Sequence, residues 1–194
     1  MSSFRGFLLS FAVVAAMMGA ACGTPPDKEM QQAQAAIDSA RAAGADRFAR
    51  EEFAAAEGAL KRSHDAVAQR DYRLALDVAL DARERAQIAA KQAADEKIAA
   101  RADAERALAE ADAALHESRA KLKAAETARA SAKVLVAARR AIADGETAVQ
   151  EARTTLEQGD YLAAADQSRA AATRLRGTTR DLDAVPTTGT RRRR

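Results

Sequence analysis

Large apolar side chains recur every seven residues through most of this chain, with polar and small residues between them. Such spacing places a narrow apolar stripe on one face of a helix, where a second helix can pack against it. The stripes therefore predict paired helices. The series are Phe53, Leu60 and Val67; Leu108, Leu115 and Leu122; and Leu135, Ile142, Val149 and Leu156.

The body contains an internal repeat. The segment 57–77 is similar to the segment 146–166, and in both copies the apolar series ends at a short polar turn. The turns read Gln69-Arg70-Asp71-Tyr72 and Gln158-Gly159-Asp160-Tyr161. The glycine of the second turn can take the left-handed conformation that ends a helix, and each aspartate can cap the next helix. The pattern predicts two helical hairpins whose tyrosines pack back on the preceding helix.

Composition makes the fold class definite. Alanine forms more than a quarter of the chain, aromatic residues only 4%, and no proline occurs between Lys28 and Ala184. Residues of high helix propensity dominate this span. We therefore expect an all-α protein of elongated antiparallel hairpins, similar to coiled coils, because alanine buries too little apolar area for a large globular core. The leucine series and the following series are out of phase, which indicates an offset or a helix break near Thr127 to Lys133.

These patterns predict six segments along the chain. A signal segment and a tether come first, then two hairpins joined by a long helix, and finally a basic tail. In residue numbers these are 1–21 (signal peptide), 22–27 (tether), 28–100 (first hairpin), 101–139 (connecting helix), 140–182 (second hairpin) and 183–194 (tail, ending in Arg191, Arg192, Arg193 and Arg194).

Cys22 is the only cysteine, and it stands where the apolar leader gives way to the polar body. Arg5 precedes a short apolar run, Phe7 to Met18, and the small residues Gly19 to Ala21 lead into the cysteine. This order is typical of an exported bacterial protein. The apolar run is shorter than the ~20 residues that span a bilayer as a helix. The prolines after Gly23 favour an extended spacer that would hold the body off a membrane.

The leader resembles the lipobox of bacterial lipoproteins, in which small residues end at a cysteine. In that family the cysteine receives a diacylglycerol thioether and the signal is cut before it, so the resemblance implies lipidation of Cys22. Gly19 stands where the family has an aliphatic residue. Gly23 follows the cysteine, and family sorting rules then favour the outer membrane, with the body facing the periplasm. Ordinary signal cleavage and an uncleaved anchor with an inert thiol are the alternatives.

The first hairpin also resembles a family. Ile37 to Arg41, Gly44 to Ala49, Phe53 to Ala56 and the Asp71-Tyr72 turn are similar to an alpha-helical domain of bacterial lipoproteins, domain of unknown function 4398 (DUF4398). The likeness covers about residues 28 to 100, with a degenerate second copy near 140 to 177. Arg70 replaces the usual turn glycine. The resemblance implies the fold and no biochemical activity.

The chain offers little for catalysis or for binding a cofactor or metal. His64 and His116 lie on different predicted segments without ligand spacing, and we expect both to face solvent. The net charge of +3 arises largely from the four terminal arginines. The body therefore lacks the excess of positive charge that is typical of nucleic-acid-binding proteins, and we expect no specific binding of nucleic acid. We assign no catalytic, cofactor-binding or metal-binding residue, no cofactor and no small-molecule substrate.

The function expected from these observations is that of a lipid-anchored envelope protein with a structural or protein-interaction role and no enzymatic activity. Its partners are the membrane, through lipid on Cys22, and another protein or a second copy, through its helical faces. One alternative is a periplasmic module, similar to tetratricopeptide repeats, that binds peptide or glycan with Phe48, Phe53, Tyr72 and Tyr161 as anchors. Another is a cytoplasmic coiled coil whose N-terminal segment is not a signal.

Overall fold

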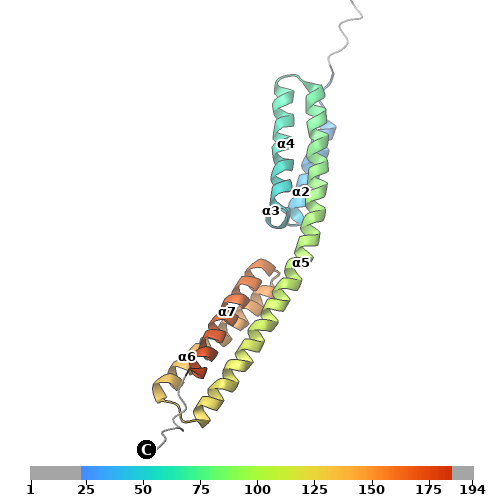
Figure 1. Ribbon diagram of the computed structural model, residues 1–194. Coiled ribbons are helices and arrows are strands. Elements are labelled where there is room, and N and C mark those ends of the chain that lie inside the picture. Colours follow the sequence, from blue (N-terminus) through green and yellow to red (C-terminus); the bar gives the residue numbers. More distant parts are fainter. Residues whose placement is uncertain (1–22, 185–194) are drawn as a thin grey trace, which may run out of the picture. The chain divides into compact units, whose positions relative to one another are not determined.

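The computed structural model describes residues 23–184, and in them every regular element is a helix. This confirms the all-α prediction (Figure 1). The helices are α2 (Asp27–Ala42), α3 (Ala45–Phe48), α4 (Arg50–Ala68), α5 (Tyr72–Thr127), α6 (Ala132–Glu157) and α7 (Tyr161–Asp183).

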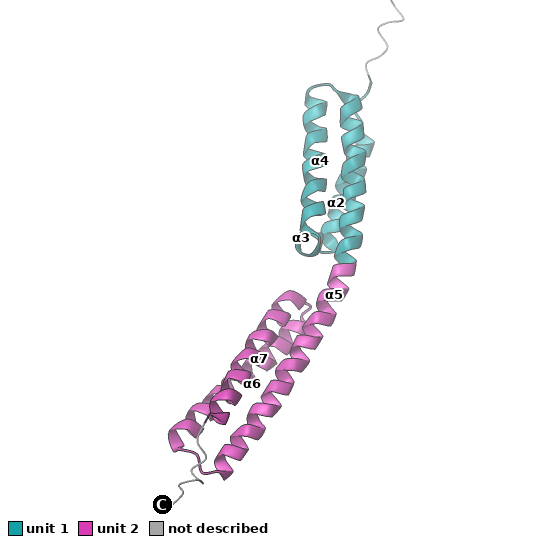
Figure 2. Ribbon diagram, viewed as in Figure 1, with its two compact units in different colours: residues 1–94 teal, residues 95–194 magenta. Residues whose placement is uncertain are grey.

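The chain divides into two compact units, which meet within α5 between Ala94 and Asp95 (Figure 2). Unit 1 contains α2, α3, α4 and the first part of α5. Unit 2 contains the rest of α5 with α6 and α7. Each unit is thus a set of three long helical segments, and α5 serves as the last of the first set and the first of the second.

The segment 101–139 differs from the single connecting helix that the sequence predicts. Helix α5 ends at Thr127, and α6 begins at Ala132 and packs back against it. The break lies in the stretch where the apolar series change phase, as expected. Because Leu115 of α5 shares a buried cluster with Ile142 and Val149 of α6, this segment belongs to the core of unit 2.

The turns α4–α5, α5–α6 and α6–α7 have the same geometry. In each, one residue has positive φ: Arg70 (61°), Arg129 (57°) and Gly159 (82°). The amide of that residue donates to the carbonyl three residues earlier, and the next amide donates to the carbonyl five residues before it. This pair of bonds satisfies the last carbonyls of the preceding helix. The left-handed residue predicted at Gly159 is confirmed.

The core of unit 1 joins large side chains of two helices to a stripe of alanine on the third. Helix α5 buries only alanine here, at alternating spacings of four and three residues, whereas α2 and α4 contribute Ile37, Phe53 and Leu60. The small stripe lets the helices approach closely, and the larger side chains fill the remaining space. The alanines are Ala75, Ala79, Ala82, Ala86, Ala89 and Ala93.

The core of unit 2 is built around Leu175 of α7, which is fully buried. It lies against Gly145 of α6, where a Cβ atom added to the glycine would stand 2.5 Å from Leu175 Cδ2. A hydroxyl network adjoins this contact: Ser118 Oγ of α5 donates to the Leu175 carbonyl at 3.0 Å and lies 3.0 Å from Thr179 Oγ1. Among the described glycines of this unit, Gly145 is thus the one whose position has no room for a methyl group.

Candidate functional site

The first described residue, Gly23, lies at the end of unit 1 that carries the α4–α5 turn. A Cβ atom added to Gly23 would stand 3.9 Å from both Cβ and Cδ2 of Tyr72, the first residue of α5. Pro26 is buried, and its carbonyl accepts a hydrogen bond from the Met30 amide at 3.0 Å. The segment 23–26 therefore lies along unit 1, in place of the projecting spacer that the sequence predicts.

Cys22, the predicted lipidation site, lies outside the described residues, as do Arg191, Arg192, Arg193 and Arg194. Lipidation and the role of the tail stay predictions. Since Cys22 precedes Gly23, however, the chain that carries it leaves unit 1 beside Tyr72. The structure thus identifies the part of the folded body that is nearest to the predicted anchor, which spacing along the sequence could not do.

The α4–α5 turn next to this point is well formed. The Asp71 side chain accepts a hydrogen bond from the Leu74 amide at 3.0 Å, which is the predicted cap. Asp160 accepts likewise from the Ala163 amide at the α6–α7 turn, at 3.4 Å. Arg70 and Arg73 are exposed, and Leu74 exposes 48% of its surface. The turn thus presents two cations and one apolar side chain to solvent.

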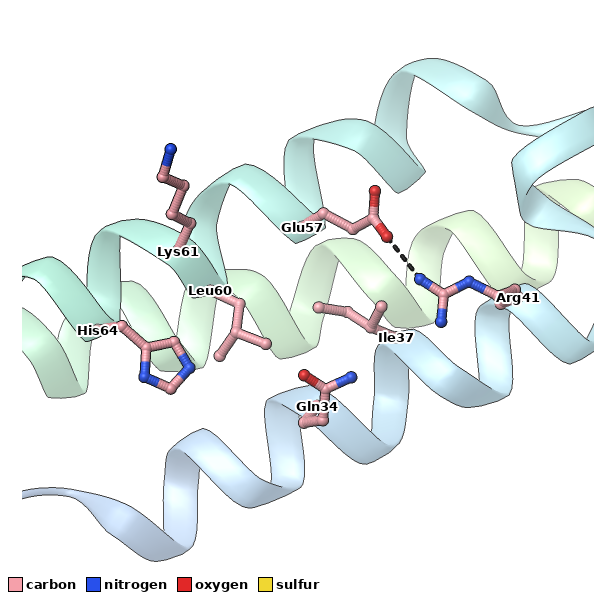
Figure 3. A pocket seen from close by; sticks show the side chains of 7 residues that line it. All are labelled: Gln34, Ile37, Arg41, Glu57, Leu60, Lys61 and His64. Atoms are coloured by element: carbon pink, nitrogen blue, oxygen red, sulfur yellow. Dashed lines mark hydrogen bonds and ion pairs between the residues drawn. The ribbon is translucent and has the colours of Figure 1, made fainter.

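Unit 1 also has a groove between α2 and α4 (Figure 3). Its volume is about 320 Å³, near the lower end of the range for small-molecule sites. Ile37 and Leu60 form its apolar floor, and the ion pair between Arg41 and Glu57 crosses it at 2.6 Å. Gln34, Lys61 and His64 complete the lining.

The cation that crosses this groove is held by other groups of unit 1. Arg41 pairs with Glu57 and its guanidinium carbon lies 5.3 Å from the centre of the Phe53 ring, so its charge is engaged within the unit. His64 and His116 are both exposed and belong to different units, as expected from their spacing. Within residues 23–184, no group of three or more histidine, cysteine, aspartate or glutamate side chains is placed to hold a metal ion.

Ion pairs set the electrostatics of both units. A hydrogen bond from Arg85 to Asp81 raises the pKa of Arg85, and a bond from Arg101 to Glu105 raises the pKa of Arg101. The pKa of Lys121 on α5 is raised by its hydrogen bond to Asp183 at the end of α7. All three shifts keep cations charged, and they stabilise helices without tuning any group towards proton transfer near neutral pH.

The four aromatic residues of the peptide-binding alternative occupy packing positions. Phe53 is buried in the unit 1 cluster, and Phe48 is half-buried against it. Tyr72 and Tyr161 are also half-buried, Tyr72 beside Gly23 and Tyr161 against a small alanine cluster of unit 2. None of the four lines the α2–α4 groove.

Comparison with family models, curated proteins and solved structures finds no match to this chain. Among the helices of residues 23–184, none has both the length and the apolar character needed to cross a membrane.

Proposed function

We propose that this chain is a lipid-anchored protein of the bacterial cell envelope, with a structural or protein-interaction role and no catalysis. The observation that carries the proposal is the position of Cys22: a lone cysteine after an apolar leader and directly before a folded helical body. Two or more acyl chains on such a cysteine hold a protein firmly on a membrane, whereas one chain binds only marginally. Gly23 after the cysteine favours the outer membrane, with both units facing the periplasm.

The anchor is tested by labelling cells with an alkyne analogue of palmitate. The wild-type chain is expected to take up label at one site, and Cys22→Ser to take up none. Thr24→Ser is the matched control, since it alters a neighbouring residue and leaves the sulfur in place. Mass spectrometry of the mature N-terminus should show an acylated Cys22 as the first residue. Label that persists in the Cys22→Ser chain would falsify the proposal.

The interaction role is supported by the outer face of α5 in unit 1. Leu74, Leu80 and Ile88 each expose at least 40% of their surface there. At 3.6 residues per turn they fall within about a third of the helix circumference, away from the buried alanine stripe. A face of this kind suits a partner helix or a second copy of the chain. The same face carries exposed charges of both signs, such as Asp77 and Lys91.

Photocrosslinking in the envelope tests this role. A photoreactive amino acid at Ile88 is expected to give a discrete adduct, and the same group at exposed Glu51 of α4 serves as the control within unit 1. Sedimentation of the purified chain separates self-association from binding of another protein. A monomer that gives no adduct at Ile88 beyond the control level would contradict the interaction role.

One observation favours the alternative function of a peptide- or glycan-binding module, namely the α2–α4 groove. Calorimetric titration with soluble peptidoglycan fragments tests it. If the groove is the site, Lys61→Glu should weaken the heat of binding, because it reverses a charge in the lining at an exposed position outside the core, whereas exposed Glu51→Gln should leave the heat unchanged. Absence of binding heat with the wild-type chain would exclude these fragments as ligands.

A further inference from the structure

We propose that the α4–α5 turn of unit 1 is a membrane-contact surface that rests on the headgroups of an anionic bilayer. The proposal deepens the proposed function, since it depends on an anchor at Cys22. The binding partner of this surface is the lipid bilayer itself. The surface consists of Arg70, Arg73 and Leu74, and it is called the anchor-side turn below.

Chain connectivity brings the anchor-side turn to the membrane. Gly23 lies against Tyr72, and one peptide unit of about 3.8 Å separates its Cα from that of Cys22. Lipid on Cys22 therefore begins within a residue length of the first turn of α5. Pro26 is buried, so the segment that follows Cys22 is held to unit 1 both at Gly23 and at Pro26.

The chemistry of the anchor-side turn suits an interface between water and lipid. Arg70 and Arg73 are exposed, and no ion pair or hydrogen bond from either side chain to another residue is found among the described residues. Leu74, which follows Arg73, exposes 48% of its surface. Side chains in the first turn of a helix tilt towards its N-terminus, which here is the end beside the anchor. Arg73 and Leu74 of α5 thus lean towards the anchor, and Arg70 lies in the turn itself.

Acidic groups share this end of unit 1 with the two arginines and lower its net charge. Asp71 is engaged as the cap of α5 through the Leu74 amide. The remaining acids at this end, Asp27, Glu29 and Asp65, are partly balanced by exposed Lys28. Two arginines within a Debye length of about 8 Å of anionic headgroups are attracted to them at physiological salt.

The test uses the chain from Cys22 onward, which keeps every described helix. Its single cysteine can be coupled to a maleimide phospholipid in vesicles of phosphatidylcholine and phosphatidylglycerol, so an anchor is present whether or not a cell attaches one. The chain has no tryptophan, which makes an introduced one a unique reporter. In the Leu74→Trp chain we expect a blue-shifted emission and about twofold or greater quenching by lipids brominated near the headgroups.

Ile88→Trp is the matched control. Ile88 lies on the same helix with a similar exposed fraction, 42% against 48%, and about 21 Å further along α5 at 1.5 Å per residue. Its tryptophan should remain unquenched. Equal quenching of both reporters would show that α5 lies flat on the bilayer, and this would overturn the proposal. A Leu74→Trp chain that is fully coupled to lipid but not quenched would also overturn it.

Charge reversal tests the cationic part of the surface. In the Leu74→Trp background, Arg70→Glu and Arg73→Glu together should lower the equilibrium constant for contact with anionic vesicles by more than about fivefold for each arginine, the cost of losing one positive charge. Arg50→Glu with Lys91→Glu is the control, because both residues are exposed in unit 1 far from the turn and the charge change is equal. Equal loss in the two double variants would overturn the assignment to this turn.

The lipid anchor at Cys22 and the membrane contact of the anchor-side turn are tested by different measurements. If mass spectrometry finds no acyl group on Cys22 of the protein purified from cells, the proposed function fails, whatever the vesicles show. If Cys22 is acylated in cells but the coupled Leu74→Trp chain stays unquenched, the anchor stands and the contact surface is wrong.

Discussion

The contact between Gly145 and Leu175 makes a sharp prediction about unit 2. Removing the buried leucine with Leu175→Ala should destabilise the unit by about 3–5 kcal/mol, the usual cost of lost burial plus a cavity. Gly145→Ala would place a methyl group 2.5 Å from Leu175 Cδ2 and 2.9 Å from Cγ. Overpacking of this kind costs about 1–3 kcal/mol, and the higher helix propensity of alanine offsets about 1 kcal/mol of it.

The effect of Gly145→Ala on the free energy of unfolding should change sign when Leu175 is removed. In the Leu175→Ala background the clash is gone, so Gly145→Ala should stabilise by about 1 kcal/mol or more through helix propensity and partial filling of the cavity. The double variant would then resemble unit 1, where the repeat places Ala56 and Ala86 at the matching positions, both fully buried. The coupling energy between the two sites should reach about 2 kcal/mol.

Urea denaturation followed by circular dichroism at the helical band measures these free energies of unfolding. Gly177→Ala is the control on the same helix as Leu175, because an added Cβ there meets no atom within 4 Å. It should stabilise by about 1 kcal/mol in both backgrounds. If Gly145→Ala is stabilising in the wild-type chain, or if its effect is the same with and without Leu175, the close approach does not limit packing and the reasoning is refuted.

Three further predictions concern turns, buried hydroxyls and pH. Arg70→Gly should stabilise by about 1 kcal/mol, because φ is 61° there. Ser168→Ala should be neutral or stabilising, since its buried hydroxyl has no hydrogen-bond partner within residues 23–184, whereas Ser118→Ala should cost about 1–2 kcal/mol. Lys121 has a raised pKa, so the stabilisation from its pair with Asp183 is complete below its unfolded pKa of about 10.4 and lost as pH rises through the folded value.

Denaturation curves check the first two predictions, and thermal melts of the wild-type and Asp183→Asn chains from pH 8 to 12 check the third. The difference between those two chains should shrink at the alkaline end. A destabilised Arg70→Gly chain would contradict the strain at the turn. Ser168→Ala and Ser118→Ala chains of equal stability would contradict the distinction between their hydroxyls, and a difference that grows with pH would contradict the ion pair.

Local signals in the sequence predicted the turns well. The aspartate caps and the left-handed glycine depend on backbone geometry within a few residues, which the residue types nearly dictate. The third turn, at Arg129, has the same geometry without the Asp-Tyr signature. There the sequence indicated a break only through the changed phase of the leucine series, because no residue in that stretch is a strong helix breaker.

The surface next to Cys22 could not be predicted from sequence. The cysteine and its leader are a local pattern, and their interpretation as a lipid anchor stays a prediction. That Gly23 lies beside Tyr72 depends on contact between residues far apart in the chain. Prolines after Gly23 predicted a spacer by local preference alone, and burial of Pro26 against unit 1 overrode that preference.

The helical class, the repeat and the approximate turns follow from local sequence, because propensity, capping and seven-residue spacing are properties of neighbouring residues. Which face of α5 is buried in unit 1 depends instead on packing between helices. Alanine occupies several faces of that helix and carries little directional signal, so the larger Leu80 and Ile88 would be expected inside, yet they are exposed. Close packing against the bulky side chains of α2 and α4 selects the alanine face, since only small residues leave room for them.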